Sequence, residues 1–274
     1  MPNKLAIIMS GGGMSCSYGA GVTTALIEKF NIINPDIVIA RSGSAGTGSY
    51  FISKQYDSIK NIWQNLLSNK KFINPLRILQ PMDIDYLIDI VFKKQDPLNV
   101  SNIYNSNIQF FVPATNSKTG EIKYFNNKDN VDWLEVLRAT KALPPLFNKT
   151  VTIDNKKYFD VYGQRLNKID ISKAVGLGAT KIIVIDNENR NFINNIIFSI
   201  LIRLKIRTFW INYYKNIDVA EKILTNANID IIYLTPKKQL KVGPINNNQK
   251  NLQKVFRQGF DETINNKDLI SFLN

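Results

Sequence analysis

The first fifty residues contain the same arrangement twice: a short apolar run, a glycine-rich turn, and then apolar residues at helical spacing. In the first copy, residues 5–9 precede the turn SGGG, and apolar side chains then recur every four residues as far as Phe30. In the second copy, residues 36–40 precede the turn SGSAG, and residues 50–52 continue as helix. A strand–turn–helix unit repeated in this way predicts an α/β fold, with a mostly parallel central sheet and helices on its faces.

Later segments extend this alternation over the rest of the chain. Pairs of short apolar runs around turn residues predict two hairpins, and longer periodic runs predict further helices. We expect hairpins at 108–125 and 151–159, helices at 84–92, 133–142, 171–177 and 252–260, and strands at 181–185 and 231–234. Because no repeat or linker interrupts the sequence, we expect one domain over residues 1–274, with residues 190–274 as its helical and strand C-terminal part.

The chain contains no histidine and a single cysteine, Cys16. This composition excludes Ser-His-Asp and Cys-His catalysis, all histidine-containing metal sites and any intrachain disulfide. A hydrolase built from this sequence must therefore use a base other than imidazole. We expect no metal and no cofactor, and we expect Cys16 to be a packing residue.

The first turn, Ser10 to Met14, leaves unobstructed backbone N–H groups between a strand and a helix, a typical arrangement for binding an anion. The anion is either a nucleotide phosphate or the oxyanion of a tetrahedral intermediate. A dinucleotide site needs an acidic residue at the end of the second strand, where this chain has Ala40 and Arg41. We therefore favour an oxyanion hole, although a tight turn without a ligand remains an alternative. Its predicted residues are Gly11, Gly12, Gly13 and Met14.

The second turn has the context of a nucleophile elbow, in which a sharp strand–helix turn exposes a serine. The usual elbow has glycine two residues before and two residues after the serine. Here Ser44 takes the central place, Gly46 follows it at the right spacing, and Ser42 stands in the first position. Taken alone the pattern is weak, because a plain glycine-serine loop has the same composition.

The two turns together resemble the patatin-like phospholipase family. That family carries a GGG-x-R/K-G loop, a G-x-S-x-G elbow and a later D-G-G/A motif, and this chain has GGGMSCSYGAGV and then SGSAGTGS. The resemblance continues through residues 138–147, 153–160, 167–186 and 241–262. It implies a three-layer patatin-like α/β sandwich and a lipid acyl-hydrolase without a cofactor. It also implies cleavage of fatty-acyl esters of phospholipids or lysophospholipids through a Ser-Asp dyad with Ser44 as nucleophile.

The chain departs from the family's motifs at two places. Ser15 and Cys16 stand where the family has a cation and a glycine, which leaves backbone N–H groups as the donors of the loop. The D-G-G/A motif is interrupted, so either Asp160 or Tyr162 takes the place of the aspartate. We favour Asp160, because an insertion in an exposed loop is easier than a shift of hairpin register. If Tyr162 takes it, the dyad is broken and the protein is a pseudoenzyme.

The formal charge of +13 favours anionic partners, either a membrane surface or a nucleic acid. Residues 192–214 combine apolar and aromatic side chains with Arg203, Lys205 and Arg207, which suits either a membrane-docking segment or a buried helix. No signal peptide or membrane span is visible, so we expect a cytoplasmic protein, peripheral at an anionic membrane. Three functions remain open: an acyl-hydrolase, which we favour, a lipid- or protein-binding module, and a nucleotide- or nucleic-acid-binding protein.

Overall fold

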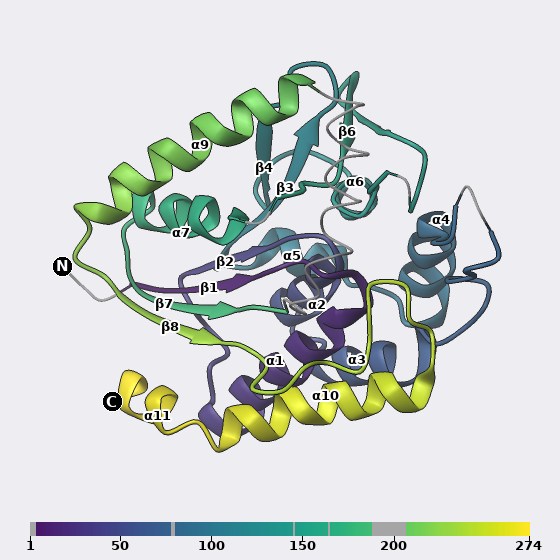
Figure 1. Cartoon of the computed structure of the whole chain (residues 1–274). Helices are drawn as coiled ribbons and strands as arrows, with labels where there is room; N and C mark the ends of the chain where they lie inside the picture. The colour runs from purple at the N-terminus through teal and green to yellow at the C-terminus, as the bar shows by residue number, and fades with distance from the viewer. Residues whose placement is uncertain (1–3, 78–79, 145, 164, 188–206) are drawn as a thin grey trace.

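The computed structural model describes residues 4–77, 80–144, 146–163, 165–187 and 207–274. In this part of the chain, a central eight-stranded sheet lies between two layers of helices (Figure 1). The order of the main path is β5-β6-β3-β2-β1-β7-β8, and β4 pairs with β3 beside it. The predicted three-layer α/β architecture with a mostly parallel sheet is confirmed.

Five neighbouring strands of the sheet are parallel and three further strands extend it in antiparallel fashion. The parallel strands are Lys4–Met9 (β1), Ile37–Ala40 (β2), Gln109–Asn116 (β3), Ala179–Ile185 (β7) and Asp230–Leu234 (β8). The antiparallel strands are Ile122–Asn126 (β4), Val151–Ile153 (β5) and Lys156–Phe159 (β6). The carboxyl ends of β1, β2 and β7 therefore meet at one edge of the sheet, where ligands of parallel sheets bind.

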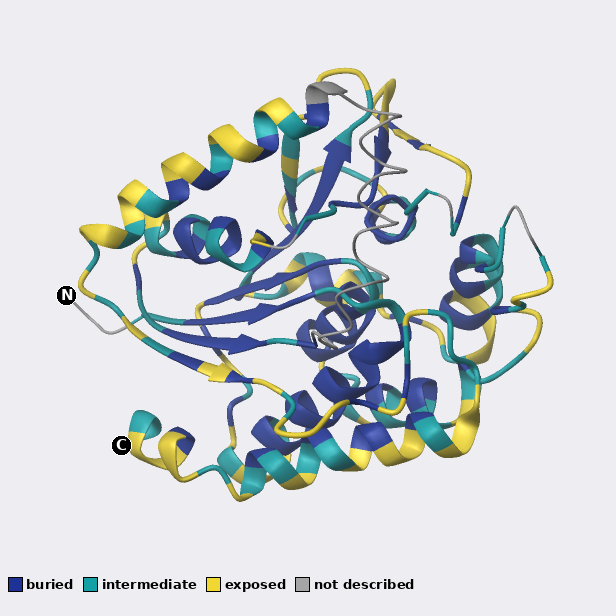
Figure 2. Ribbon diagram, in the orientation of Figure 1, coloured by how far each residue is buried: buried dark blue, intermediate teal, exposed yellow. Residues whose placement is uncertain are grey.

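The central strands are buried on both faces, because alternate side chains enter two different cores (Figure 2). Ile7 and Met9 belong to the core on the side of α1, whereas Ala6 and Ile8 belong to the core on the side of α7. This explains why the strands are continuous apolar runs in the sequence.

Helices cover the two faces unequally. Helices α1 and α10 pack together on one face, and α7 covers the other, with α9 packed against it (Figure 1). The helices are Ser17–Phe30 (α1), Gly43–Ile52 (α2), Tyr56–Asn61 (α3), Ile84–Tyr86 (α4), Val100–Asn105 (α5), Trp133–Ala139 (α6), Leu166–Gly176 (α7), Arg207–Thr225 (α9), Gln249–Ile264 (α10) and Lys267–Leu273 (α11). A 3₁₀ turn, Gly13–Cys16 (η1), and two π-helical segments, Ile62–Leu66 (η2) and Leu87–Gln95 (η3), complete these layers.

Most predicted elements are present, with two informative differences in length. Both hairpins and the strand at 181–185 are confirmed. The helix predicted over 133–142 ends at Ala139, because the next three residues bind the candidate site instead of continuing the helix. Helix α7 begins at Leu166, five residues before the predicted start.

The segment predicted over 192–214 lies mostly outside the described residues. Its last part opens α9, where Phe209 and Tyr213 are buried, while Ile211 is 61% exposed and Tyr214 is 50% exposed. The core alternative is therefore correct for part of this stretch. Within the described ranges, no helix combines the length and the apolar composition needed to cross a membrane.

Candidate active site

The chain turns sharply between β2 and α2, and Ser42 is the residue at the turn. Its backbone has φ 52° and ψ −128°, which a residue with a Cβ adopts at a cost of about 1–3 kcal/mol. The Ser42 N–H donates to Thr140 Oγ1 at 3.0 Å, and Lys141 Nζ donates to the Ser42 carbonyl at 2.8 Å. Two side chains that follow α6 therefore hold the strained turn in place.

Ser42 also contacts the predicted base. Its Oγ donates to Asp160 Oδ2 at 2.7 Å. Asp160 comes directly after β6, and its own N–H donates to the carbonyl of Ala142 at 3.1 Å. The carboxylate is 2% exposed, and Asp160 Oδ1 has no hydrogen-bond partner among the described residues. Asp160 Oδ2 thus accepts the hydrogen bond from the Ser42 hydroxyl, and Asp160 Oδ1 remains available to accept another hydrogen bond in the site.

Ser44, the serine that we predicted to face Asp160, lies elsewhere. It is in the first turn of α2, it is 2% exposed, and its Oγ accepts a hydrogen bond from Asn187 Nδ2 at 3.1 Å. The prediction that Ser44 stands at the elbow within reach of Asp160 is therefore wrong as geometry. The physical reason is the helix: once α2 has begun at Gly43, the next side chain points back toward the end of β7 and not into the turn.

Gly46, which set the expected spacing of the elbow, has a packing role. A Cβ at this position would lie 3.0 Å from Phe92 Cζ, so the missing side chain lets η3 pack closely on α2. Reading the elbow from Ser42 instead places small residues, Ala40 and Ser44, two positions on either side. The sequence allows the elbow motif to be centred on Ser42, but the glycine at position 46 favoured the alignment centred on Ser44.

Of the two residues that could occupy the aspartate position, Asp160 is the one that meets Ser42. Tyr162 also lines the cavity, but its ring packs edge-on against Trp210 of α9, with centroids 6.5 Å apart. The hairpin register of β5 and β6 therefore controls which residue reaches the elbow, and the two additional residues before Gly163 lie in the loop.

The glycine loop, from Gly11 to Cys16, packs directly on this elbow. A Cβ on Gly11 would lie 3.0 Å from Ser42 Cβ, and a Cβ on Gly13 would lie 2.6 Å from the carbonyl oxygen of Pro244. In the described structure, the N–H groups of Gly11, Gly12 and Gly13 donate to no protein acceptor, whereas the N–H of Met14 donates to Pro244 O at 3.0 Å. Met14 is therefore occupied, and the other three predicted oxyanion donors remain available.

Burial sets the ionisation of the site. Desolvation raises the pKa of Asp160 to about 7, against the lowering effects of the Ser42 hydrogen bond and of the charges of Lys141 and Arg41. Desolvation also lowers the pKa of Lys141 to about 7, opposed by Asp160. Desolvation raises the pKa of Cys16 to about 11, so this buried thiol stays neutral. A carboxylate with a pKa near neutrality is well placed to accept and return a proton.

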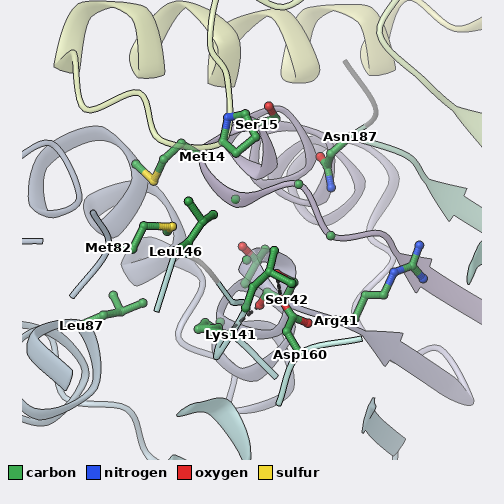
Figure 3. A pocket seen from close by; sticks show the side chains of 18 of the residues that line it. Met14, Ser15, Arg41, Ser42, Met82, Leu87, Lys141, Leu146, Asp160 and Asn187 are labelled. Atoms are coloured by element: carbon green, nitrogen blue, oxygen red, sulfur yellow. Dashed lines mark hydrogen bonds between the residues drawn. The ribbon is translucent and has the colours of Figure 1, made fainter. Parts of the chain in front are cut away.

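A cavity of about 510 Å³ opens at this point, a size typical of small-molecule sites. Figure 3 shows Ser42, Lys141 and Asp160 together on one side of it and Met82, Leu87 and Leu146 on another. Ser44 does not line it. The apolar part is formed by α3, η2, α4, η3 and the segments that follow η2 and α6: Ile59, Ile62, Trp63, Leu67, Phe72, Met82, Ile84, Leu87, Phe92, Leu143 and Leu146.

The sequence interpretation missed four residues that complete the site. Gly43 follows Ser42, and its N–H is free of protein acceptors in the described chain. Thr140 and Lys141 bind the backbone of Ser42. Asn187 donates to Ser10 O at 2.7 Å and accepts from Gly19 N at 2.8 Å, which joins the glycine loop to α1. Only Asn187 had a usable signal, because it follows a strand whose carboxyl end reaches the site.

Comparison with known proteins places this arrangement in a family. Residues 7–161 match the model of the patatin-like phospholipases. The chain belongs to the patatin-like phospholipase family. The matched part begins in β1 and ends just after Asp160, so it contains the glycine loop, the elbow and the aspartate of this family member.

Two individual proteins are similar to this patatin-like chain. The uncharacterized protein YjjU of Escherichia coli (strain K12) is 27% identical over 192 residues, which cover 67% of this chain and 52% of YjjU. The chain thus spans about half the length of the curated relative that it matches. The crystal structure of VipD from Legionella pneumophila aligns with 99% of this chain and 67% of VipD, with a TM-score of 0.54 and 13% identity. At 13% identity this similarity concerns the fold alone.

Proposed function

We propose that this protein is a lipid acyl-hydrolase in which Ser42 is the nucleophile and Asp160 is the general base. The observation that carries the proposal is the 2.7 Å hydrogen bond from Ser42 Oγ to Asp160 Oδ2 at a strained strand–helix turn that opens into a cavity. A serine at such a turn, paired with a base, is the arrangement of an activated nucleophile. Membership of the patatin-like phospholipase family supports hydrolysis of acyl esters in general.

The proposed reaction begins when Ser42 Oγ attacks the ester carbonyl while its proton passes to Asp160 Oδ2. The oxyanion of the tetrahedral intermediate accepts hydrogen bonds from the N–H groups of Gly12, Gly13 and Gly43, each worth about 3 kcal/mol in comparable sites. The alcohol leaves with the proton from Asp160, and an acyl-serine remains. Asp160 then takes a proton from water, which attacks the acyl-serine; the bond between the acyl carbon and Ser42 Oγ breaks, the proton returns from Asp160 to Ser42 Oγ, and the fatty acid is released.

The substrates that we propose are fatty-acyl esters of phospholipids or lysophospholipids. The apolar wall that includes Trp63, Met82, Leu87 and Leu146 suits an acyl chain, since each buried methylene contributes about 0.8 kcal/mol. The net charge of +13 suits substrate presented on an anionic membrane surface, which we propose as the partner in preference to nucleic acid.

The test is labelling with a fluorophosphonate probe, which reacts only with an activated serine, followed by peptide mapping. We expect the wild type to be labelled on Ser42, Ser42→Ala to lose labelling and esterase activity by about 10⁴-fold, and Asp160→Asn to lose most of both. The matched control is Ser44→Ala, which we expect to be labelled and to remain active.

Two results would contradict the proposal. Labelling of Ser44, together with retained activity in Ser42→Ala, would restore the assignment based on motif spacing. A folded wild type that neither reacts with the probe nor hydrolyses p-nitrophenyl esters and lysophosphatidylcholine would favour a lipid- or protein-binding module.

A further inference from the structure

A buried ammonium group stands behind the elbow. Lys141 is 7% exposed, lines the cavity, and its Nζ donates to the carbonyl of Ser42 at 2.8 Å as its only hydrogen bond among the described residues. The other cation of the described cavity lining is Arg41, whose guanidinium pairs with Asp170. Burial of an ammonium is costly unless nearby groups compensate it, so this lysine needs an explanation beyond packing.

The segment that carries Lys141 binds both halves of the proposed dyad. Thr140 Oγ1 accepts a hydrogen bond from the N–H of Ser42, and Lys141 Nζ donates one to the carbonyl of Ser42. The carbonyl of Ala142 accepts a hydrogen bond from the N–H of Asp160. These three consecutive residues fix the position of the serine relative to the carboxylate. Lys141 is the member of the three that also brings charge.

Among the described residues, Lys141 is the cation that acts most strongly on Asp160. The glycine loop, from Gly11 to Cys16, carries no cationic side chain. Arg41, which is bound to Asp170, has a smaller lowering effect on the pKa of Asp160, and the nearby thiol of Cys16 stays neutral because burial raises its pKa to about 11. Among the charged side chains, Lys141 therefore has the largest influence on the ionisation of the carboxyl, after the effects of burial and of the Ser42 hydrogen bond.

We infer that Lys141 is a positioning residue that holds the strained carbonyl of Ser42 and favours the ionised form of Asp160 in its buried site. The inference rests on the proposed function, in which Asp160 acts as the base. The physical reason is that a buried carboxyl without a neighbouring cation takes up a proton, and a protonated carboxyl can no longer accept a proton from serine. The opposing effects of Lys141 and of burial on the pKa of Asp160 agree with this reading.

The experiment compares three substitutions at Lys141 by measuring kcat/KM against pH. Lys141→Met keeps the length of the buried stem and removes the charge, Lys141→Gln keeps a donor for the Ser42 carbonyl without charge, and Lys141→Arg keeps the charge. The control is Lys149→Met, which removes an exposed lysine paired with Asp85.

We expect the acidic limb of the profile to move to higher pH by about one unit in Lys141→Met and Lys141→Gln, since a nearby cation lowers a carboxyl pKa by about 1–3 units. At pH 6 this corresponds to about a tenfold lower kcat/KM, with much of the loss recovered at pH 9. Lys141→Arg and Lys149→Met should keep the limb of the wild type. A role in packing alone would scale the profile without moving it, and that result in both neutral variants would overturn the inference.

A second measurement separates this inference from the proposed function. The carboxyl ¹³C resonance of Asp160, assigned with Asp160→Asn, reports its pKa by NMR titration without any catalysis. If the wild type hydrolyses no ester but the resonance titrates at higher pH in Lys141→Gln, the proposed function fails while the electrostatic role stands. An unchanged titration in Lys141→Gln refutes the role of Lys141 whether or not the protein is active.

Discussion

The strain at Ser42 predicts that replacement by glycine and by alanine has opposite relative effects on stability at Ser42, in the turn, and at Ser44, in the helix that follows it. At Ser42, alanine and glycine both remove the hydroxyl, so the lost hydrogen bond to Asp160 cancels when the two variants are compared. The positive φ of 52° costs alanine about 1–3 kcal/mol and costs glycine almost nothing. Glycine loses about 0.4–1 kcal/mol through the greater freedom of its unfolded chain. The free energy of unfolding of Ser42→Gly should therefore exceed that of Ser42→Ala by about 1 kcal/mol.

At Ser44 the sign reverses, because this residue lies in the first turn of α2. Glycine is less favourable than alanine in a helix by about 1 kcal/mol, so Ser44→Gly should be less stable than Ser44→Ala. The four variants differ only in a Cβ at two positions separated by one residue. The pair at Ser44 is thus the matched control for the pair at Ser42.

The assay is urea unfolding followed by far-UV circular dichroism, with the midpoints compared at equal m-values. In thermal unfolding the same difference amounts to about 2–4 °C. If glycine is the less stable variant at both positions, Ser42 is not held in a strained turn, and the elbow is at another residue.

Three further outcomes test the site and its surroundings. The activity of the wild type should fall as the pH drops through about 7, because Asp160 acts as a base only when ionised; a profile that stays flat down to pH 5 would exclude it as the base. Gly13→Ala should lower kcat at least tenfold, because its Cβ would lie 2.6 Å from Pro244 O at a backbone φ of 56°, and unchanged kinetics would remove the glycine loop from catalysis. Leu87→Trp should shift the preference among p-nitrophenyl esters to shorter acyl chains by filling the apolar wall, and an unchanged preference would place the acyl chain elsewhere.

A surface prediction follows from composition. With a net charge of +13, the protein should sediment with phosphatidylserine-containing vesicles at low salt and should be released between about 0.1 M and 0.5 M salt. Equal binding to purely zwitterionic vesicles would exclude an electrostatic membrane surface. Tighter binding to an oligonucleotide of equal charge would favour the nucleic-acid alternative.

The sequence determined the class of fold and the two turns that carry the site. Continuous apolar runs such as residues 37–40 mark strands buried on both faces, and the glycine turns that follow them can lie only at the carboxyl edge of a parallel sheet. The absence of histidine can be read from the composition, and the position of Asp160 after a hairpin can be read from the local sequence pattern. These inferences depend on local periodicity and composition, which tertiary packing did not override.

Only the tertiary structure decided which serine faces the carboxylate. Ser42 and Ser44 stand in one run of small residues, and a spacing pattern accepts either register. The choice depends on where α2 begins, and α2 begins at Gly43. The side chains of Thr140 and Lys141, a hundred residues away in the chain, bind the backbone of Ser42 at that point. Contacts between such distant segments leave no periodic trace in the sequence, because they form only when the sheet brings their ends together.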